Sequence, residues 1–172
     1  IGYNSYTQPD MEVWGYSSPV VPGFVAHLTY QLTNLNNVNG TGLFKTVLPN
    51  MFTPNITAVS PNTYTLSGDT VIWNFNNITI SGGGSYFGID FYVPVGTTLG
   101  SAFSTCMYAQ PNITDFNYGN NDFCYSRYVT GSFDPNDKTV SPVGVGPSGD
   151  IAASVTDLTY LIRFQNTGNG PA

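Results

Sequence analysis

The sequence predicts an all-β protein built as a β-sandwich of about seven to nine strands. Apolar and polar residues alternate with a period of two in many short segments, and no segment shows the 3.6-residue period of an amphipathic helix. Aromatic residues make up 15% of the chain and charged residues only 8%, so a large core is possible without helices. The 19 glycines and 12 prolines fall mostly between the apolar segments, where turns are expected.

The expected strands follow one another along the chain with turn residues between them. They cover residues 11–16, 24–33, 44–48, 56–60, 64–66, 71–80, 87–93, 102–109 and 123–130. In the longest one, alternate apolar residues share a face that we expect to be buried: Phe24, Ala26, Leu28, Tyr30 and Leu32. Turn signals such as Ser17-Ser18-Pro19 and Ser67-Gly68-Asp69 end or begin these strands.

The strand pattern begins again near the C-terminus. Leu158-Thr159-Tyr160 repeats Leu28-Thr29-Tyr30, and the alternation leads into a segment rich in Asn and Gly. We therefore expect a first domain over residues 1–133, a linker rich in Pro and Gly over 134–149, and the first strands of a second, truncated β-domain over 150–172. A fragment of a tandem stalk and a complete filament subunit both remain possible explanations.

The last segment carries an apolar stripe that it cannot bury alone. Its members are Leu158, Tyr160, Ile162 and Phe164. We expect this stripe to act as a strand donor or interface that adds to the sheet edge of a neighbour. Head-to-tail pairing of this kind does not close, and it would produce a filament.

The two cysteines, Cys106 and Cys124, lie on segments expected to be adjacent strands. An even count and a composition common among extracellular β-proteins favour a disulfide between them. The alternative is a pair of free thiols in the core. In either case the expected role is structural.

The charge of the chain excludes several classes of partner. Its formal net charge is −6, and its four basic residues are Lys45, Lys138, Arg127 and Arg163. Four scattered cations cannot form the basic stripe that nucleic acids require, so we expect no nucleic-acid partner. No apolar run is long enough to span a bilayer, so we expect no membrane insertion. Ile1 is not an initiator Met and no leader pattern follows it, which suggests a mature or excised chain.

Several motifs resemble a family of repeats in bacterial envelope proteins. The matching pieces, in chain order, are Pro22-Gly23, Leu28-Thr29-Tyr30, Asn34, Leu48-Pro49, Val71-Ile72-Trp73 and Gly82-Gly83-Gly84. More specifically, residues 130–138 (TGSFDPNDK) and 162–168 (IRFQNTG) resemble the linker and repeat start of large secreted proteins of Bacteroidota.

This resemblance implies an immunoglobulin-like β-sandwich in an extracellular or cell-surface protein without catalysis of its own. Such proteins usually end in a tail that is sorted through the type nine secretion system. Asp69-Thr70-Val71 matches a short O-glycosylation signal that bacteria of this phylum use, which makes Thr70 a candidate glycosylation site.

A group of oxygen-bearing side chains near the expected linker could bind calcium. Its members are Asp134, Asn136 and Asp137, with Asp122 or Asp150 as a further ligand. Calcium at a domain junction would stiffen a stalk. The alternative is that these residues form side-chain-to-backbone turns beside Pro135. No other cofactor is expected.

The sequence offers little material for catalysis. His27 is the single histidine, and its position in the alternating pattern places it on the solvent face of its strand. No spacing of Ser, His and Asp suggests a nucleophile with its base. We therefore expect a protein that is not an enzyme.

Surface glycans are possible partners, because the chain has more tyrosines than one core can bury. The candidates for an exposed platform are Tyr3, Tyr6, Tyr16, Tyr86, Tyr92, Tyr118, Tyr125 and Tyr128. The alternative is ordinary packing on half-buried sheet faces. The sequence thus favours an extracellular structural module (a stalk, adhesin or filament subunit), with a glycan-binding accessory module of a secreted hydrolase as the alternative.

Overall fold

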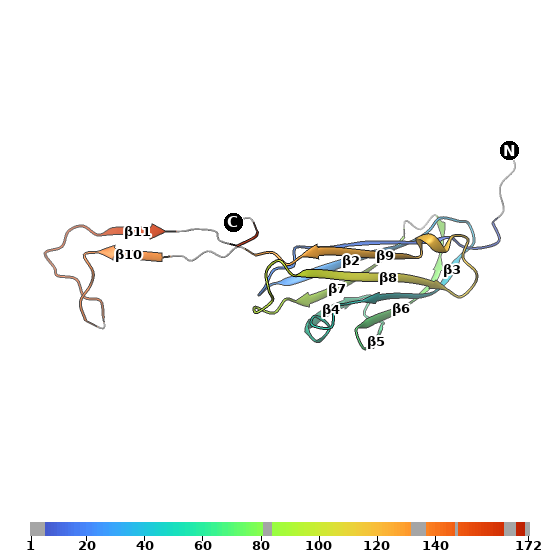
Figure 1. Cartoon of the computed structure of the whole chain (residues 1–172), viewed down its shortest axis with the longest axis horizontal. Helices are drawn as coiled ribbons and strands as arrows, with labels where there is room; N and C mark the ends of the chain where they lie inside the picture. Colours follow the sequence, from blue (N-terminus) through green and yellow to red (C-terminus); the bar gives the residue numbers. More distant parts are fainter. Residues whose placement is uncertain (1–5, 81–83, 132–136, 147, 164–167, 171–172) are drawn as a thin grey trace, which may run out of the picture. The chain divides into compact units, whose positions relative to one another are not determined.

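The computed structural model describes residues 6–80, 84–131, 137–146, 148–163 and 168–170 of the 172-residue chain. The chain divides into two compact units, Ile1–Thr130 and Gly131–Ala172 (Figure 1). The described part contains no helix with the length and apolar character needed to cross a bilayer.

The first unit is a β-sandwich of two antiparallel sheets, which confirms the predicted fold class. One sheet has four strands in the order β1-β2-β7-β4, and the other has five in the order β5-β6-β3-β8-β9. The bounds are β1 Met11–Ser17, β2 Val25–Asn34, β3 Gly40–Val47, β4 Ile56–Ser60, β5 Thr65–Ser67, β6 Thr70–Ile78, β7 Ser85–Tyr92, β8 Ala102–Pro111 and β9 Asp122–Tyr128. Two short 3₁₀ turns, η1 (Thr53–Asn55) and η3 (Tyr118–Asn120), lie in the described connections.

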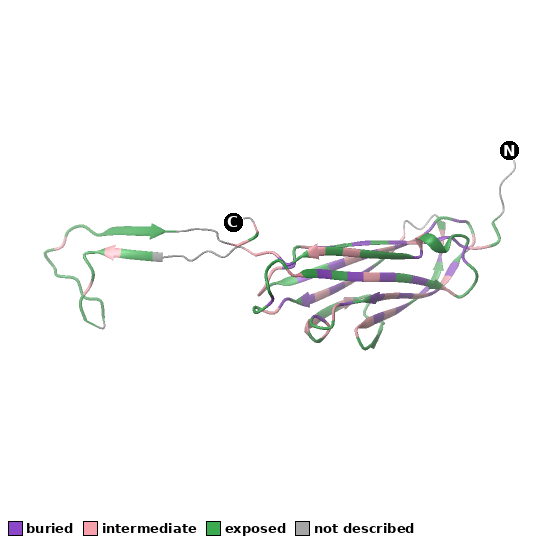
Figure 2. Cartoon of the chain, in the orientation of Figure 1, coloured by how far each residue is buried: buried purple, intermediate pink, exposed green. Residues whose placement is uncertain are grey.

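Buried and exposed residues alternate along most of these strands, as the sequence pattern predicts (Figure 2). Aromatic rings from the two sheets meet in the core: the ring centroids of Phe44 and Phe87 are 4.5 Å apart, and those of Phe91 and Phe103 are 5.4 Å apart. Trp73 is buried against Phe44 and Phe87. This interdigitation explains why a chain with few charges and many aromatics folds without helices.

A cluster of three hydroxyl groups joins the two sheets inside the apolar core. Tyr30 projects inward from β2, and Thr46 and Thr105 project inward from β3 and β8. The Thr46 hydroxyl donates to the Tyr30 oxygen at 3.0 Å, and the Thr105 hydroxyl lies 3.4 Å from the same oxygen. Burial raises the pKa of Tyr30 to about 12, although both hydrogen bonds oppose this shift.

A fully bonded amide closes the end of β2. Asn34 is buried, and its Oδ1 accepts hydrogen bonds from the main-chain N–H groups of Asp10 and Asn36 at 3.2 and 3.0 Å. Its Nδ2 donates to the carbonyl oxygens of Val38 and Ile78 at 2.7 and 2.9 Å. One side chain therefore connects three segments that are distant in the sequence, and it satisfies backbone groups that would otherwise be buried unpaired.

The Asn-rich connection between β8 and β9 is an ordered loop. Its Asp115 is buried, and one carboxylate oxygen accepts a hydrogen bond from the Met11 N–H at 3.0 Å while the other accepts one from the Asn117 N–H. The Phe116 N–H donates to the Pro9 carbonyl at 2.8 Å. These bonds attach the loop to the chain segment that enters β1.

The second unit contains an antiparallel hairpin of β10 (Asp137–Ser141) and β11 (Thr159–Arg163). The sequence pattern predicts a strand at β11, but it predicts a linker over 134–149, where β10 lies. The alternation in this segment is too short and polar to distinguish a strand from a linker, and pairing with β11 decides the matter. The ammonium group of Lys138 lies 4.7 Å from the centroid of the Tyr160 ring.

Two further expectations for the first unit were wrong. Phe24 lies in the turn before β2 and is 67% exposed, because the strand begins one residue later. Ile80 lies beyond the end of β6 and is exposed, whereas Ile78 is buried. In both cases the apolar pattern extends beyond the strand, before its start at Phe24 and after its end at Ile80.

Candidate functional site

The predicted disulfide between Cys106 and Cys124 is present. The two cysteines are register partners on β8 and β9, and their Cα atoms are 4.1 Å apart. They lie on the outer face of the five-stranded sheet, because the adjacent Thr105 and Met107 point into the core. The bridge joins the edge strand β9 to its neighbour, which is a structural role.

The described members of the predicted apolar stripe, which begins one residue before β11, are exposed to solvent. The exposed fractions of Leu158, Tyr160 and Ile162 are 43%, 53% and 60%. Phe164, the fourth predicted member, lies outside the described residues. Of the described strands, β10 is the one that pairs with β11.

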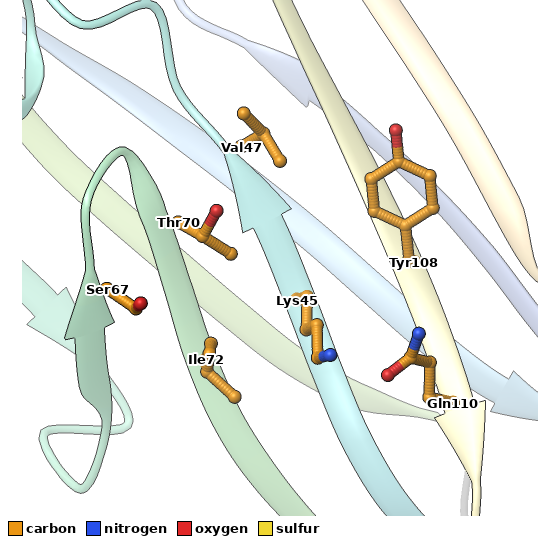
Figure 3. A pocket seen from close by; sticks show the side chains of 7 residues that line it. All are labelled: Lys45, Val47, Ser67, Thr70, Ile72, Tyr108 and Gln110. Carbon is orange, nitrogen blue, oxygen red and sulfur yellow. The ribbon is translucent and has the colours of Figure 1, made fainter.

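The outer face of the five-stranded sheet contains a shallow hollow of about 400 Å³ (Figure 3). Lys45 on β3 stands between Ile72 on β6 and Tyr108 on β8, which are its register partners on either side. The hollow is completed by Val47, Ser67, Thr70 and Gln110. It offers an ammonium group, a phenol and an amide on an open surface.

Thr70, the candidate glycosylation site, begins β6 and faces the same hollow (Figure 3). The preceding Asp69 occupies the β5–β6 turn, where its carboxylate accepts a hydrogen bond from the Thr53 hydroxyl at 2.9 Å. The threonine hydroxyl is therefore at the surface beside a turn. Glycosylation at this position stays a prediction.

The predicted calcium ligands are mostly beyond what the structure describes. Asp134 and Asn136 lie outside the described residues, and for Asp137 only the backbone, paired with Arg163, is described. Asp122 is exposed on β9, and Asp150 is exposed in an isolated bridge to Val145. Within the described residues, no group of three His, Cys, Asp or Glu side chains could hold a metal ion. The calcium site stays a prediction.

His27 lies on the outer face of the four-stranded sheet, as the alternation predicts. Its Nδ1 is 2.8 Å from Oδ1 of Asp90, which is its register partner on β7. The hydroxyl of Ser18 accepts a hydrogen bond from the main-chain N–H of His27 at 2.9 Å. The pairing of His27 with Asp90 could not be found from the sequence, because the residues are 63 positions apart.

The candidate tyrosines divide between several surfaces. The outer face of the four-stranded sheet carries three of them: Tyr16, Tyr86 and Tyr92. The other described ones lie elsewhere in the first unit: Tyr6, Tyr118, Tyr125 and Tyr128. Of these, Tyr6 packs edge-to-face on Phe116 with centroids 5.5 Å apart, and Tyr125 is half-buried against the core. Tyr3 lies outside the described residues.

This face also carries a tryptophan that is absent from the candidates predicted from the sequence. Trp14 is 42% exposed on β1, two residues before Tyr16, and the two rings stack with centroids 5.7 Å apart and an interplanar angle of 20°. The indole N–H donates to the side-chain oxygen of Gln31 on β2. The alternation in β1 placed Trp14 opposite Val13, and this signal could have added it to the candidate platform.

Comparisons with known proteins found structural likeness only. No family model and no curated protein matches the chain. A DUF4466 family protein from Parabacteroides merdae is similar in structure, with 10% sequence identity and a TM-score of 0.49. The match covers 77% of this chain and 49% of that protein, so the chain spans about half of that protein's length.

Two further solved structures are similar. BslA, described as a bacterial hydrophobin, has 13% identity and a TM-score of 0.45 over 71% of this chain and 93% of that one. The sixth cohesin of scaffoldin B from Acetivibrio cellulolyticus, solved with a mutant Cel5 dockerin, has 16% identity and a TM-score of 0.37 over 61% of this chain and 84% of that one. At these identities and TM-scores, the similarities assign no function to the chain.

Proposed function

We propose that this chain is a non-enzymatic extracellular structural module of a bacterial surface protein, serving as a stalk, adhesin or filament unit. Its neighbours would be further copies or domains of the same protein, joined by strand addition at β11. The disulfide supports a location outside the cell, because such bonds persist in oxidising compartments. The resemblance of residues 130–138 and 162–168 to secreted Bacteroidota repeat proteins supports export through the type nine system.

The observation that carries this proposal is the contrast between two copies of one strand motif. In β2, Leu28 and Tyr30 are at most 1% exposed, because the strand lies between β1 and β7 and faces a second sheet. In the second copy, the corresponding Leu158, one residue before β11, and Tyr160, within β11, are 43% and 53% exposed. The same motif thus supports a buried central strand in one place and an exposed one in the other.

The hairpin of β10 and β11 has the antiparallel arrangement of β1 and β2. The residue paired with Thr29 is Tyr16, and the residue paired with the corresponding Thr159 is Ser141. In the first unit, the other edge of β2 pairs with β7, whose inward residues are Phe87, Ile89 and Phe91. A strand of this apolar, alternating kind would complete the hairpin, with backbone hydrogen bonds for affinity and side-chain pockets for register.

Sedimentation velocity over a concentration series, combined with electron microscopy, tests this proposal on the whole chain. We expect the wild-type chain to associate through β11 and to form linear assemblies, since exposed apolar edge strands are templates for pairing. Ile162→Ser should abolish association. Leu161→Ser is the matched control, because Leu161 is 48% exposed on the opposite face of the same strand and corresponds to the outward Gln31 of β2.

The proposal fails if the wild-type chain stays monomeric at every concentration. It also fails if Ile162→Ser and Leu161→Ser have equal effects, because the association would then not depend on the predicted face. Far-ultraviolet circular dichroism of each variant checks that the first unit remains folded.

A further inference from the structure

The outer face of the four-stranded sheet carries a group of aromatic and polar side chains that the structural role of the module does not use. We propose that this face binds a neutral polysaccharide through the rings of Trp14, Tyr16 and Tyr86. This inference goes beyond the proposed function and does not depend on strand addition at β11. It also requires no attached hydrolase.

Two of the three rings are held in place by contacts on this face. Trp14 is held by its stack on Tyr16 and by the hydrogen bond from its indole to Gln31. The register places Trp14 opposite Gln31 on β2, and Gln31 opposite Tyr86 on β7, so the two rings are separated by two strand spacings, about 10 Å. Rings that are already ordered lose little conformational entropy on binding.

Apolar aromatic faces and sugar rings are chemically complementary. A pyranose ring presents C–H groups on its flat faces, and these groups pack on the electron-rich face of an indole or a phenol. The exposed fractions of Trp14, Tyr16 and Tyr86 are 42%, 48% and 61%, so a substantial part of each ring is available to a ligand. Several rings on one sheet suit an extended chain of sugars better than a single sugar.

Polar groups lie beside the rings, where sugar hydroxyls would be. The next row across the sheet joins Tyr16, Thr29 and Gly88, and the row after it contains the hydrogen-bonded pair of His27 and Asp90. The side chains of His27 and Asp90 are 58% and 38% exposed, so the imidazole offers a ring nitrogen and the carboxylate offers acceptor oxygens to sugar hydroxyl groups. Gly88 has no side chain, which leaves the position beside Tyr86 on the outer face of β7 low.

The charge of the face selects a neutral ligand. The four strands of this sheet contain no lysine or arginine, and their acidic residues include Glu12 and Asp90. The chain as a whole carries a net charge of −6. Uronate- or sulfate-bearing glycans would be repelled, whereas neutral glycans would not.

Native affinity electrophoresis of the full chain in gels with and without soluble polysaccharides tests the proposal. The probes are hydroxyethyl cellulose, arabinoxylan and galactomannan as neutral polymers, with alginate as the anionic comparison. We expect retardation by at least one neutral polymer, and Trp14→Ala and Tyr86→Ala should each weaken the affinity about tenfold or more. Trp14→Tyr should keep most of the affinity, because it preserves a flat ring.

Tyr128→Ala is the matched control, since Tyr128 is 67% exposed on the outer face of the other sheet. It should leave the retardation unchanged. Thermal unfolding of every variant establishes that loss of binding does not come from loss of the fold.

Four results would overturn the proposal. The first is the absence of retardation by all three neutral polymers. The second is retardation that Tyr128→Ala weakens as much as Trp14→Ala does. The third is stronger retardation by alginate than by the neutral polymers. The fourth is concentration-dependent self-association that Trp14→Ala abolishes in a chain that binds no polymer, because the face would then be an interface between copies.

Discussion

The Tyr30→Phe substitution deletes the phenol oxygen that connects the two sheets and keeps the ring that fills the core. Tyr30 is fully buried, and its oxygen contacts the hydroxyl groups of Thr46 and Thr105 at 3.0 and 3.4 Å. The threonines have other acceptors: Thr105 donates to the Val47 carbonyl at 2.9 Å, and Thr46 lies 3.3 Å from the Cys106 carbonyl. Neither threonine is therefore left without a partner.

At neutral pH we expect this substitution to lower the free energy of unfolding by about 1–2 kcal/mol. This is the usual net loss for one or two buried hydrogen bonds when the remaining groups stay satisfied. A larger loss would require an unpaired buried group, which the alternative acceptors of Thr46 and Thr105 prevent.

The effect of Tyr30→Phe should depend on pH in a defined direction. Burial raises the pKa of Tyr30 from its ordinary value near 10 to about 12. Below pH 10 the phenol is protonated in both states, and its contribution is complete. Between pH 10 and 12 the unfolded chain loses the proton while the folded chain keeps it, so wild-type stability falls by about 1.4 kcal/mol per pH unit. Phenylalanine has no such term.

Urea unfolding of both proteins at pH 8, pH 10 and pH 11.5 measures this dependence. We expect the wild type to be more stable at pH 8, and the difference to shrink above pH 10 and approach zero or change sign near pH 11.5. Other titrating groups are common to both proteins and cancel in the difference. A difference that stays constant across this range, or grows, would refute the argument that Tyr30 titrates as a buried phenol.

Three further changes test the fold. Replacing both Cys106 and Cys124 with Ser removes a cross-link with a sequence separation of 18. In the chain-entropy model this should lower the free energy of unfolding by about 3 kcal/mol. An unchanged midpoint of urea unfolding would contradict this expectation. Asn34→Ala removes the partner of four backbone groups, three of which make buried hydrogen bonds to the amide, and should cost about 3 kcal/mol or more. A loss below about 1 kcal/mol would show that water replaces the amide. Phe44→Ala opens a cavity between Tyr30 and Phe87, and it should lower the free energy of unfolding by about 3–5 kcal/mol, measured by thermal or urea unfolding. The control Leu43→Ala, on the outer face of the same strand, should lower it by less than about 1 kcal/mol.

The strands of the first unit could be located from the sequence because each one has a buried and an exposed face. The period-two pattern predicted β1, β2 and β4 to within a residue or two. The same pattern could not show where a strand begins or stops, because apolar residues continue past both ends. Phe24 and Ile80 are exposed for this reason.

The candidate sites were only partly accessible from the sequence. The cysteine pair could be inferred because its members lie on adjacent strands, which limits their separation. The pair of His27 and Asp90, and the row from Trp14 to Tyr86, depend on which strands become neighbours and in which register. Neither strand order nor register is encoded in the alternation of a single strand.

Local patterning alone determined that this chain forms β-strands, that its core is aromatic, and that the motif of Leu28 and Tyr30 occurs a second time at Leu158 and Tyr160. The tertiary structure decided that the first copy is a buried central strand, that the second lies in an exposed hairpin with β10, and that Trp14, Tyr16 and Tyr86 share one outer face. The physical reason is that alternation depends on the two faces of one strand, whereas burial and shared surfaces depend on the strands that pair beside it and the sheet that packs against it.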